Sequence, residues 1–130
     1  MKILIVEDDV DLAETCQMVL ETCHEDVQVA HSAEEALVKI AERKPDLVIS
    51  DCVLPGRSGL ELCQQLRSHY PRNTLPLMLM SGSLRSQVAH GDSYDAFLTK
   101  PFLAESLLAE VERLLHPSDI VPESIVRGAQ

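Results

Sequence analysis

Five polar residues of this 130-residue sequence stand at or just after the end of an apolar stretch, and their types together suit phosphoryl chemistry. They are Glu7, Asp8, Asp51, Ser81 and Lys100. Three carboxylates in one crevice would repel one another strongly without a cation, and hard oxygen ligands of this kind suit Mg²⁺. The metal and a lysine could then neutralise phosphoryl oxygens while one carboxylate attacks phosphorus. The residue types therefore predict a phosphoryl-transfer site, provided that the fold brings them together.

Asp51 has two explanations of about equal weight when only its neighbours in the sequence are considered. The apolar run 47–49 predicts a strand buried on both faces, and Pro55-Gly56 is a turn signal. Asp51 would then lie at the rim of a sheet, where open parallel α/β sheets bind their ligands. Alternatively, its carboxylate caps the turn or the following helix. The rest of the chain favours the first explanation.

Apolar periodicity predicts five strands that alternate with helices. Three runs are apolar throughout, whereas two are short or alternate with polar residues. Ser32 and Glu35 form a capping-box pattern that begins the second helix. The predicted strands span residues 2–6, 27–30, 47–51, 77–80 and 95–98, and the predicted helices span residues 10–23, 33–43, 58–68, 84–91 and 103–115.

Strands separated by helices predict a parallel sheet with right-handed crossovers. Central strands are buried on both faces and edge strands are not, so the second and fifth strands belong at the edges. This gives an α/β fold of (βα)5 type, a flavodoxin-like doubly wound five-stranded sheet in the order 2-1-3-4-5. Residues 1–115 form one domain in this interpretation, and residues 116–130 form a tail or linker.

The composition excludes several classes of protein. The net charge is −10 with a sequence pI of about 4.8, and no basic stripe is present, so direct nucleic-acid binding is disfavoured. No apolar run is long enough to span a membrane, and the first residues lack a signal-peptide pattern. We therefore predict a cytoplasmic protein.

The cysteines and histidines do not predict a zinc site. The four cysteines contain no C-x-x-C pair, and no two histidines have metal-ligand spacing. Cys16 and Cys63 fall on apolar helix faces, which predicts core positions, whereas Cys52 follows Asp51 at a position where its thiol could be accessible. The five histidines lie in or near predicted loops and helix ends, which predicts surface positions: His24, His31, His69, His90 and His116.

Four segments, in this order along the chain, resemble the receiver domain of two-component response regulators, the CheY-like family. They are residues 3–9 (ILIVEDD), residues 51–56 (DCVLPG), Ser81-Gly82 and Lys100-Pro101-Phe102. No single segment is specific, but all four at strand ends in a (βα)5 pattern are highly specific. The resemblance covers about residues 1–115.

The resemblance implies a metal-dependent phosphoacceptor site. Asp51 would accept a phosphoryl group from a phosphohistidine on a sensor histidine kinase or a histidine phosphotransfer protein. Asp8 and Asp51 would bind Mg²⁺ directly, together with the backbone carbonyl of Val53, and Glu7 would act through a metal-bound water. The domain would be a signalling phosphoacceptor rather than a metabolic enzyme.

The resemblance also implies a switch. Ser81 would bind a phosphoryl oxygen, Lys100 would pair with the phosphoryl group, and the bond between Lys100 and Pro101 would be cis. Phe97 stands at the aromatic position whose inward turn is coupled to the movement of the hydroxyl. The resulting change would appear on the surface formed by the fourth helix, the fifth strand and the last helix, which would contact an effector or a dimer partner.

Each residue also has a purely structural explanation. Glu7 and Asp9 favour the N-terminus of the first helix, and Ser81 suits a turn. Lys100 is explained as a surface cation, and Phe97 as part of an edge-strand core. Together these explanations require four coincidences at one rim of the sheet.

Three other functions compete with a phosphorylated receiver. A receiver-like adaptor that works without phosphorylation usually loses acidic residues, which are present here. A haloacid-dehalogenase-like phosphatase needs a second Asp two residues after the nucleophile, where this chain has Val53. A nucleotide-binding flavodoxin-like domain needs a Gly-rich loop after the first strand, where residues 7–9 would repel phosphate.

The sequence departs from the family pattern in two places. Between Ser81 and Lys100 the chain is about one helical turn shorter than usual, which predicts a short or irregular fourth helix. Val53 and Ser83 stand where the family often has polar groups that position hydrolytic water. We therefore expect slow loss of the phosphoryl group.

Overall fold

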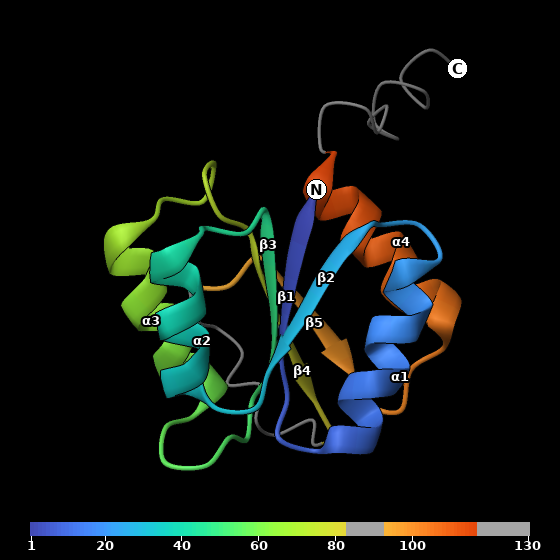
Figure 1. The fold of residues 1–130 in the computed structure, drawn as a ribbon, viewed down its shortest axis with the longest axis horizontal. Coiled ribbons are helices and arrows are strands. Elements are labelled where there is room, and N and C mark those ends of the chain that lie inside the picture. The colour runs from blue at the N-terminus through green and yellow to red at the C-terminus, as the bar shows by residue number, and fades with distance from the viewer. Residues whose placement is uncertain (83–92, 117–130) are drawn as a thin grey trace, which may run out of the picture.

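The computed structural model describes residues 1–82 and 93–116, in which one parallel sheet carries helices on both faces (Figure 1). The strand order β2-β1-β3-β4-β5 confirms the predicted topology. The helix predicted at residues 84–91 and the tail beyond residue 116 lie outside the described residues. The strands are β1 (Lys2–Val6), β2 (Asp26–Ala30), β3 (Leu47–Asp51), β4 (Leu77–Ser81) and β5 (Ala96–Thr99), and the helices are α1 (Val10–Glu21), α2 (Ala33–Glu42), α3 (Gly59–His69) and α4 (Ala104–Leu115).

Two hydrophobic clusters hold the layers together, one on each face of the sheet. The helices α2 and α3 cover one face, and α1 and α4 cover the other (Figure 1). Every residue of β1, β3 and β4 is buried, whereas β2 and β5 are only partly buried. The fully apolar runs are therefore the central strands, because burial on both faces leaves no place for exposed polar side chains.

Polar side chains fix the beginnings of three helices. Asp9 caps α1 by accepting from the backbone N–H of Leu12, and Ser32 caps α2 by accepting from that of Glu35. The carboxylate of Glu35 does reach back, but it accepts from the N–H of His31 (3.0 Å) instead of that of the cap residue. The complete capping box stands at α3, between Ser58 and Glu61.

Two expectations about exposure are wrong. The side chain of His24 is only 8% exposed, because the chain after α1 turns it against α4, where a 2.7 Å hydrogen bond joins its Nε2 to Glu112 Oε2. Cys52 is buried with 8% of its surface exposed, because it continues the β3 ladder into the cluster beneath α2 and α3. Cys16 and Cys63 are buried, as predicted.

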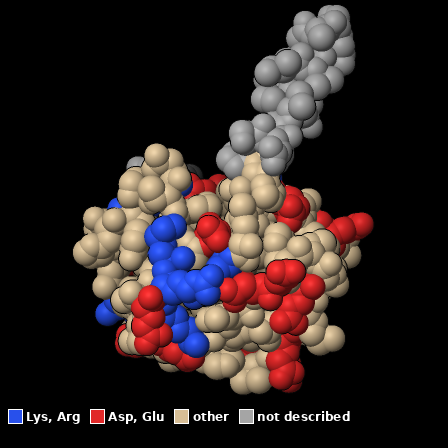
Figure 2. Space-filling model, turned by 45° about the horizontal axis from the view of Figure 1, so that its top comes forward, with Lys and Arg blue, Asp and Glu red and all other residues tan. Residues whose placement is uncertain are grey.

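Basic side chains collect at the edge of the sheet where the strands begin (Figure 2). Lys2 begins β1, Arg43 and Lys44 lie between α2 and β3, and Arg72 precedes β4. The sequence alone shows no basic stripe, since these residues come from three separate segments of the chain. Within the described residues, no helix has the length and apolar character needed to cross a membrane.

Candidate functional site

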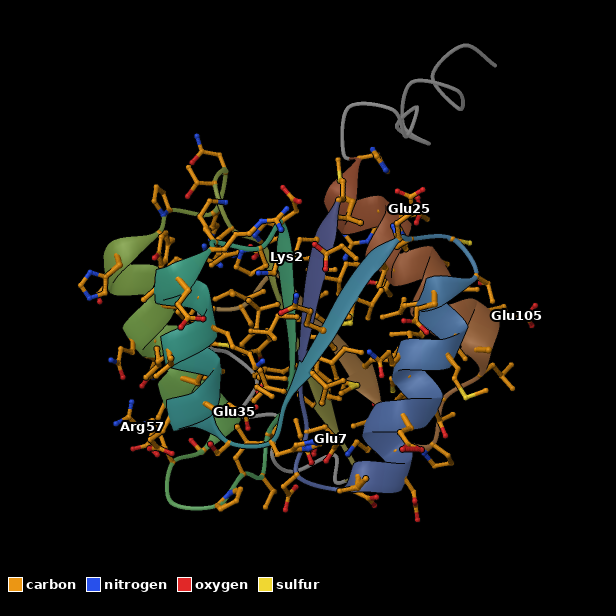
Figure 3. All side chains as sticks on the ribbon, viewed as in Figure 1. Lys2, Glu7, Glu25, Glu35, Arg57 and Glu105 are labelled. Carbon is orange, nitrogen blue, oxygen red and sulfur yellow. The ribbon has the colours of Figure 1, made fainter. Side chains whose placement is uncertain are left out.

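The candidate site lies at the carboxyl edge of the sheet, where β1, β3, β4 and β5 end side by side. In Figure 3, Lys2 marks the start of β1, and Glu7 lies at the opposite edge, directly after that strand. Asp51 and Ser81 are the last residues of β3 and β4, and Lys100 follows β5. Because parallel strands end at the same edge, four segments of the chain contribute to one site.

Three carboxylates converge there. One ligand oxygen from each of Glu7, Asp8 and Asp51 lies within 4.8 Å of the other two. Glu7 is only 1% exposed and Asp51 is buried, whereas Asp8 is exposed to solvent. The site is therefore a partly buried concentration of negative charge with one open side.

Lys100 supplies positive charge to this cluster. Its Nζ donates to Glu7 Oε1 at 2.9 Å and lies 3.1 Å from Asp51 Oδ2. Burial alone would lower the pKa of the ammonium, but the hydrogen bonds to these two carboxylates and their negative charges outweigh it and raise the pKa. Lys100 therefore remains charged at neutral pH and bridges two of the three carboxylates.

Burial dominates the ionisation of Glu7. Loss of contact with water raises the pKa of its carboxyl, and the nearby charge of Asp51 adds to this effect. The hydrogen bond from Lys100 and that from the backbone N–H of Asp9 (3.2 Å) act in the opposite direction. Burial therefore sets the direction of the shift, and the repulsion by Asp51 is a smaller contribution.

The loop after β3 holds Asp51 through backbone contacts. The N–H of Val53 points to Asp51 Oδ1 at 3.4 Å, and the N–H of Gly59 donates to the carbonyl of Cys52 at 2.9 Å. A Cβ atom on Gly59 would lie 2.0 Å from the carbonyl oxygen of Asp51. The first turn of α3 therefore packs directly against the backbone of Asp51, and only glycine permits this approach. Gly56 makes the preceding turn with φ +78°.

The remaining site residues surround this centre. Ser81 is 2% exposed, the side chain of Val53 is exposed, and the peptide bond between Lys100 and Pro101 is cis. Phe97 is partly buried against the α2/α3 cluster, with its ring centre 6.1 Å from that of Tyr94. The structure thus brings four of the predicted residues into one cluster: Glu7, Asp8, Asp51 and Lys100. Ser81 lies at the end of the neighbouring strand β4. Phe97 lies away from the cluster, on the face of the sheet that α2 and α3 cover.

The donor atoms of the cluster fit a magnesium ion. With metal–oxygen distances of about 2.1 Å, two opposite ligands of Mg²⁺ lie roughly 4.2 Å apart. The three carboxylate oxygens need at most a small movement to meet this requirement. Glu7 and Asp51 both contact Lys100, whereas Asp8 is exposed to solvent, so an ion would approach the cluster from the side of Asp8.

Comparison with known proteins agrees with this arrangement. The sequence matches the response regulator receiver domain over residues 3–112. The chain belongs to the response regulator receiver domain family. The receiver is a domain of two-component signalling proteins rather than of metabolic enzymes.

Individual relatives support the same family. Response regulator MprA of Mycobacterium avium is 38% identical over 118 residues, which cover 88% of this chain and 51% of the relative. A putative response regulator from Chloroflexus aurantiacus has a similar structure, with a TM-score of 0.81 and 35% identity over 88% of this chain and 96% of that one. Response regulator TrrA from Thermotoga maritima, solved in complex with Mg²⁺-BeF, has a TM-score of 0.81 and 29% identity over 88% of this chain and all of that one. The receiver chain spans about half the length of the curated relatives it matches.

Sequence reasoning missed three contributors to this receiver site. The Ser58-x-x-Glu61 capping box that starts α3 was visible in the sequence, and it positions the helix that packs on Asp51. The glycine requirement at Gly59 and the burial of Cys52 beside Asp51 had no local signal, because both depend on contacts between separate segments.

Proposed function

We propose that this receiver accepts a phosphoryl group on Asp51 from a phosphohistidine of a sensor histidine kinase or a histidine phosphotransfer protein, in a Mg²⁺-dependent reaction. The observation that carries the proposal is the cluster of three carboxylates within 4.8 Å of one another, with the Lys100 ammonium 3.1 Å from Asp51. Carboxylates, a cation site and a lysine are the parts that phosphoryl transfer requires.

The transfer step exchanges one bond to phosphorus for another. An oxygen of the Asp51 carboxylate forms a bond to phosphorus while the P–N bond of the donor breaks, and the electron pair of that bond stays on the imidazole nitrogen, which takes up a proton. Lys100 neutralises charge on the transferring group, and the Ser81 hydroxyl donates a hydrogen bond to one of its oxygens. Asp8, Asp51 and the carbonyl of Val53 would bind Mg²⁺, with Glu7 acting through a water; when bound, the ion stabilises negative charge on the phosphoryl oxygens.

The position of Lys100 supports a change of state after transfer. Before transfer, its ammonium bridges Glu7 and Asp51. A phosphoryl group on Asp51 presents new oxygens to the same ammonium, so the existing pairs are rearranged. We propose that Phe97 and the surface that includes β5 and α4 respond to this rearrangement and contact a downstream effector or a second copy of the chain.

Intact-mass spectrometry tests the proposal directly. The protein is incubated with acetyl phosphate, with and without Mg²⁺, and we expect one added phosphoryl group only when Mg²⁺ is present. Asp51→Asn should abolish the adduct, whereas Asp26→Asn, which changes a carboxylate at the opposite edge of the sheet, should keep it. An adduct that survives in Asp51→Asn would refute the assignment of the acceptor, and the absence of any adduct would favour an adaptor that works without phosphorylation.

A further inference from the structure

The ring of His31 joins the end of β2 to the end of β1. The two strands are in register with Val6 opposite Ala30, and the N–H of Glu7 donates to the carbonyl of Ala30 at 2.9 Å. His31 follows Ala30, and its Nδ1 lies 2.9 Å from the carbonyl oxygen of Glu7. A carbonyl oxygen only accepts, so Nδ1 carries the hydrogen and donates it. The backbone N–H and the backbone carbonyl of Glu7 are therefore both bonded to the chain after β2.

The first turn of α2 holds the residue that carries this ring. The backbone N–H of His31 donates to Glu35 Oε1 at 3.0 Å, and the N–H of Glu35 donates to Ser32 Oγ at 3.0 Å. Glu35 and Glu7 both lie at the carboxyl edge of the sheet (Figure 3). A series of hydrogen bonds thus connects the start of α2 with the carbonyl of Glu7, and His31 is its central member.

The position of Asp8 depends on this backbone. Asp8 is exposed to solvent, and no hydrogen bond or ion pair holds its carboxylate within the part of the chain that the structure describes. Its ligand oxygen nevertheless lies within 4.8 Å of those of Glu7 and Asp51. The carbonyl of Glu7 and the N–H of Asp8 belong to one planar peptide group, so a bond that fixes the carbonyl also fixes the direction in which the chain enters Asp8.

We propose that His31 is a positioning residue for the metal site, because its ring holds the peptide group between Glu7 and Asp8 and so keeps the Asp8 carboxylate near that of Asp51. This inference rests on the proposed function, in which these carboxylates bind Mg²⁺. Hydrogen bonds that orient metal ligands commonly contribute to metal affinity. His31 acts through the peptide group and is not itself a ligand.

Titration of ¹⁵N-labelled protein with Mg²⁺, followed by the amide signals of the site, measures this contribution. We expect His31→Ala to bind Mg²⁺ about 2- to 10-fold more weakly than the natural protein, the range produced by one neutral hydrogen bond. His31→Asn should restore most of the affinity, because its side-chain amide can donate to the same carbonyl. His69→Ala is the matched control, since His69 is an exposed histidine at the far end of α3, and it should leave the affinity unchanged.

The direction of the effect separates positioning from charge. Replacement of a histidine by alanine can only remove positive charge, which would tighten the binding of a cation. Weaker binding by His31→Ala therefore reports the loss of the hydrogen bond. Equal or tighter binding by His31→Ala would overturn the proposal, as would a His31→Asn variant that binds as weakly as His31→Ala.

The same spectra recorded without Mg²⁺ test the contact independently of the ion. The amide signals of Asp8 and Asp9 should move in His31→Ala and stay near their natural positions in His31→Asn, whereas unchanged signals in both variants would overturn the inference. If both effects appear but acetyl phosphate leaves no adduct, the proposed function fails and the role of His31 at the metal site remains. An adduct together with equal Mg²⁺ affinities would retain the proposed function and overturn the role of His31.

Discussion

Replacement of Gly59 by alanine should displace the backbone that carries the phosphoacceptor. A Cβ atom at this position would lie 2.0 Å from the carbonyl oxygen of Asp51, 2.9 Å from its carbonyl carbon and 3.0 Å from the Cα of Cys52. Non-bonded heavy atoms prefer separations of about 3.5–4.0 Å, so α3 or the end of β3 must move by roughly 1 Å or more. Neither neighbour is a flexible side chain that could turn away.

The expected cost combines strain with a weakened hydrogen bond. Overpacking of a close contact costs about 1–3 kcal/mol. Movement of α3 also lengthens the 2.9 Å bond from the N–H of Gly59 to the carbonyl of Cys52, which contributes about 1 kcal/mol. Against this, alanine in a helix is favoured over glycine by up to about 1 kcal/mol. We expect a net loss of about 1–3 kcal/mol in the free energy of unfolding, which lowers Tm by roughly 10 °C.

Urea unfolding of Gly59→Ala and Gly82→Ala measures this cost against a matched control. No heavy atom of the described residues lies within 4 Å of a Cβ built on Gly82, so alanine there should be neutral or stabilise by about 0.4–1 kcal/mol through the unfolded state. Gly59→Ala should also slow phosphorylation by acetyl phosphate under conditions where the protein is fully folded. If Gly59→Ala were as stable as the natural protein, the reasoning from the close backbone approach would be refuted.

Three further changes have definite expected outcomes. Lys100→Met leaves the site carboxylates without their cation, so the free energy of unfolding in urea should fall by about 1–3 kcal/mol without Mg²⁺. This loss should shrink when Mg²⁺ is added, because the ion replaces the missing charge. An equal loss in both conditions would contradict this reasoning. Ser58→Ala removes the capping box of α3 and should cost about 0.5–2 kcal/mol in the same assay; no change would mean that the cap contributes nothing. Burial raises the pKa of the Cys63 thiol to about 12, so alkylation between pH 7 and 9 should label the exposed Cys23 first, as read by peptide mass spectrometry; equally fast labelling of Cys63 would contradict its burial.

Much of the fold was predictable because its signals are local. The apolar runs that form β1, β3 and β4 are buried along their whole length, and the partly polar β2 and β5 lie at the edges. Alternation of strands and helices leaves few topologies once right-handed crossovers are required. The observed ends of the helices and strands differ by one to a few residues from the predicted ends, because individual backbone hydrogen bonds decide where an element stops. One example is the bond from the N–H of Lys100 to the carbonyl of Ser81, which lies just beyond the last residue pair of β4 and β5.

The burial of the His24 side chain could not be predicted from the residues next to it in the sequence. Its neighbours in the sequence are polar, which predicts a surface site, yet the ring is buried and bonded to Glu112, 88 residues further along the chain. Cys52 is a similar case, since its burial depends on β4 and on the helices above it. In both cases the deciding contact joins segments that the sequence does not place next to each other.

The sequence by itself determined the alternating elements, the order of the strands and the presence of carboxylates, a hydroxyl and a lysine at strand ends. The elements and their order follow from hydrophobic periodicity, and the polar residues stand in the sequence at the ends of the apolar runs. Only the tertiary structure decided that Lys100 bridges Glu7 and Asp51, that Gly59 must lack a side chain and that Cys52 is buried. These contacts depend on distances of a few ångströms between separate strands and helices, which packing sets and periodicity does not record.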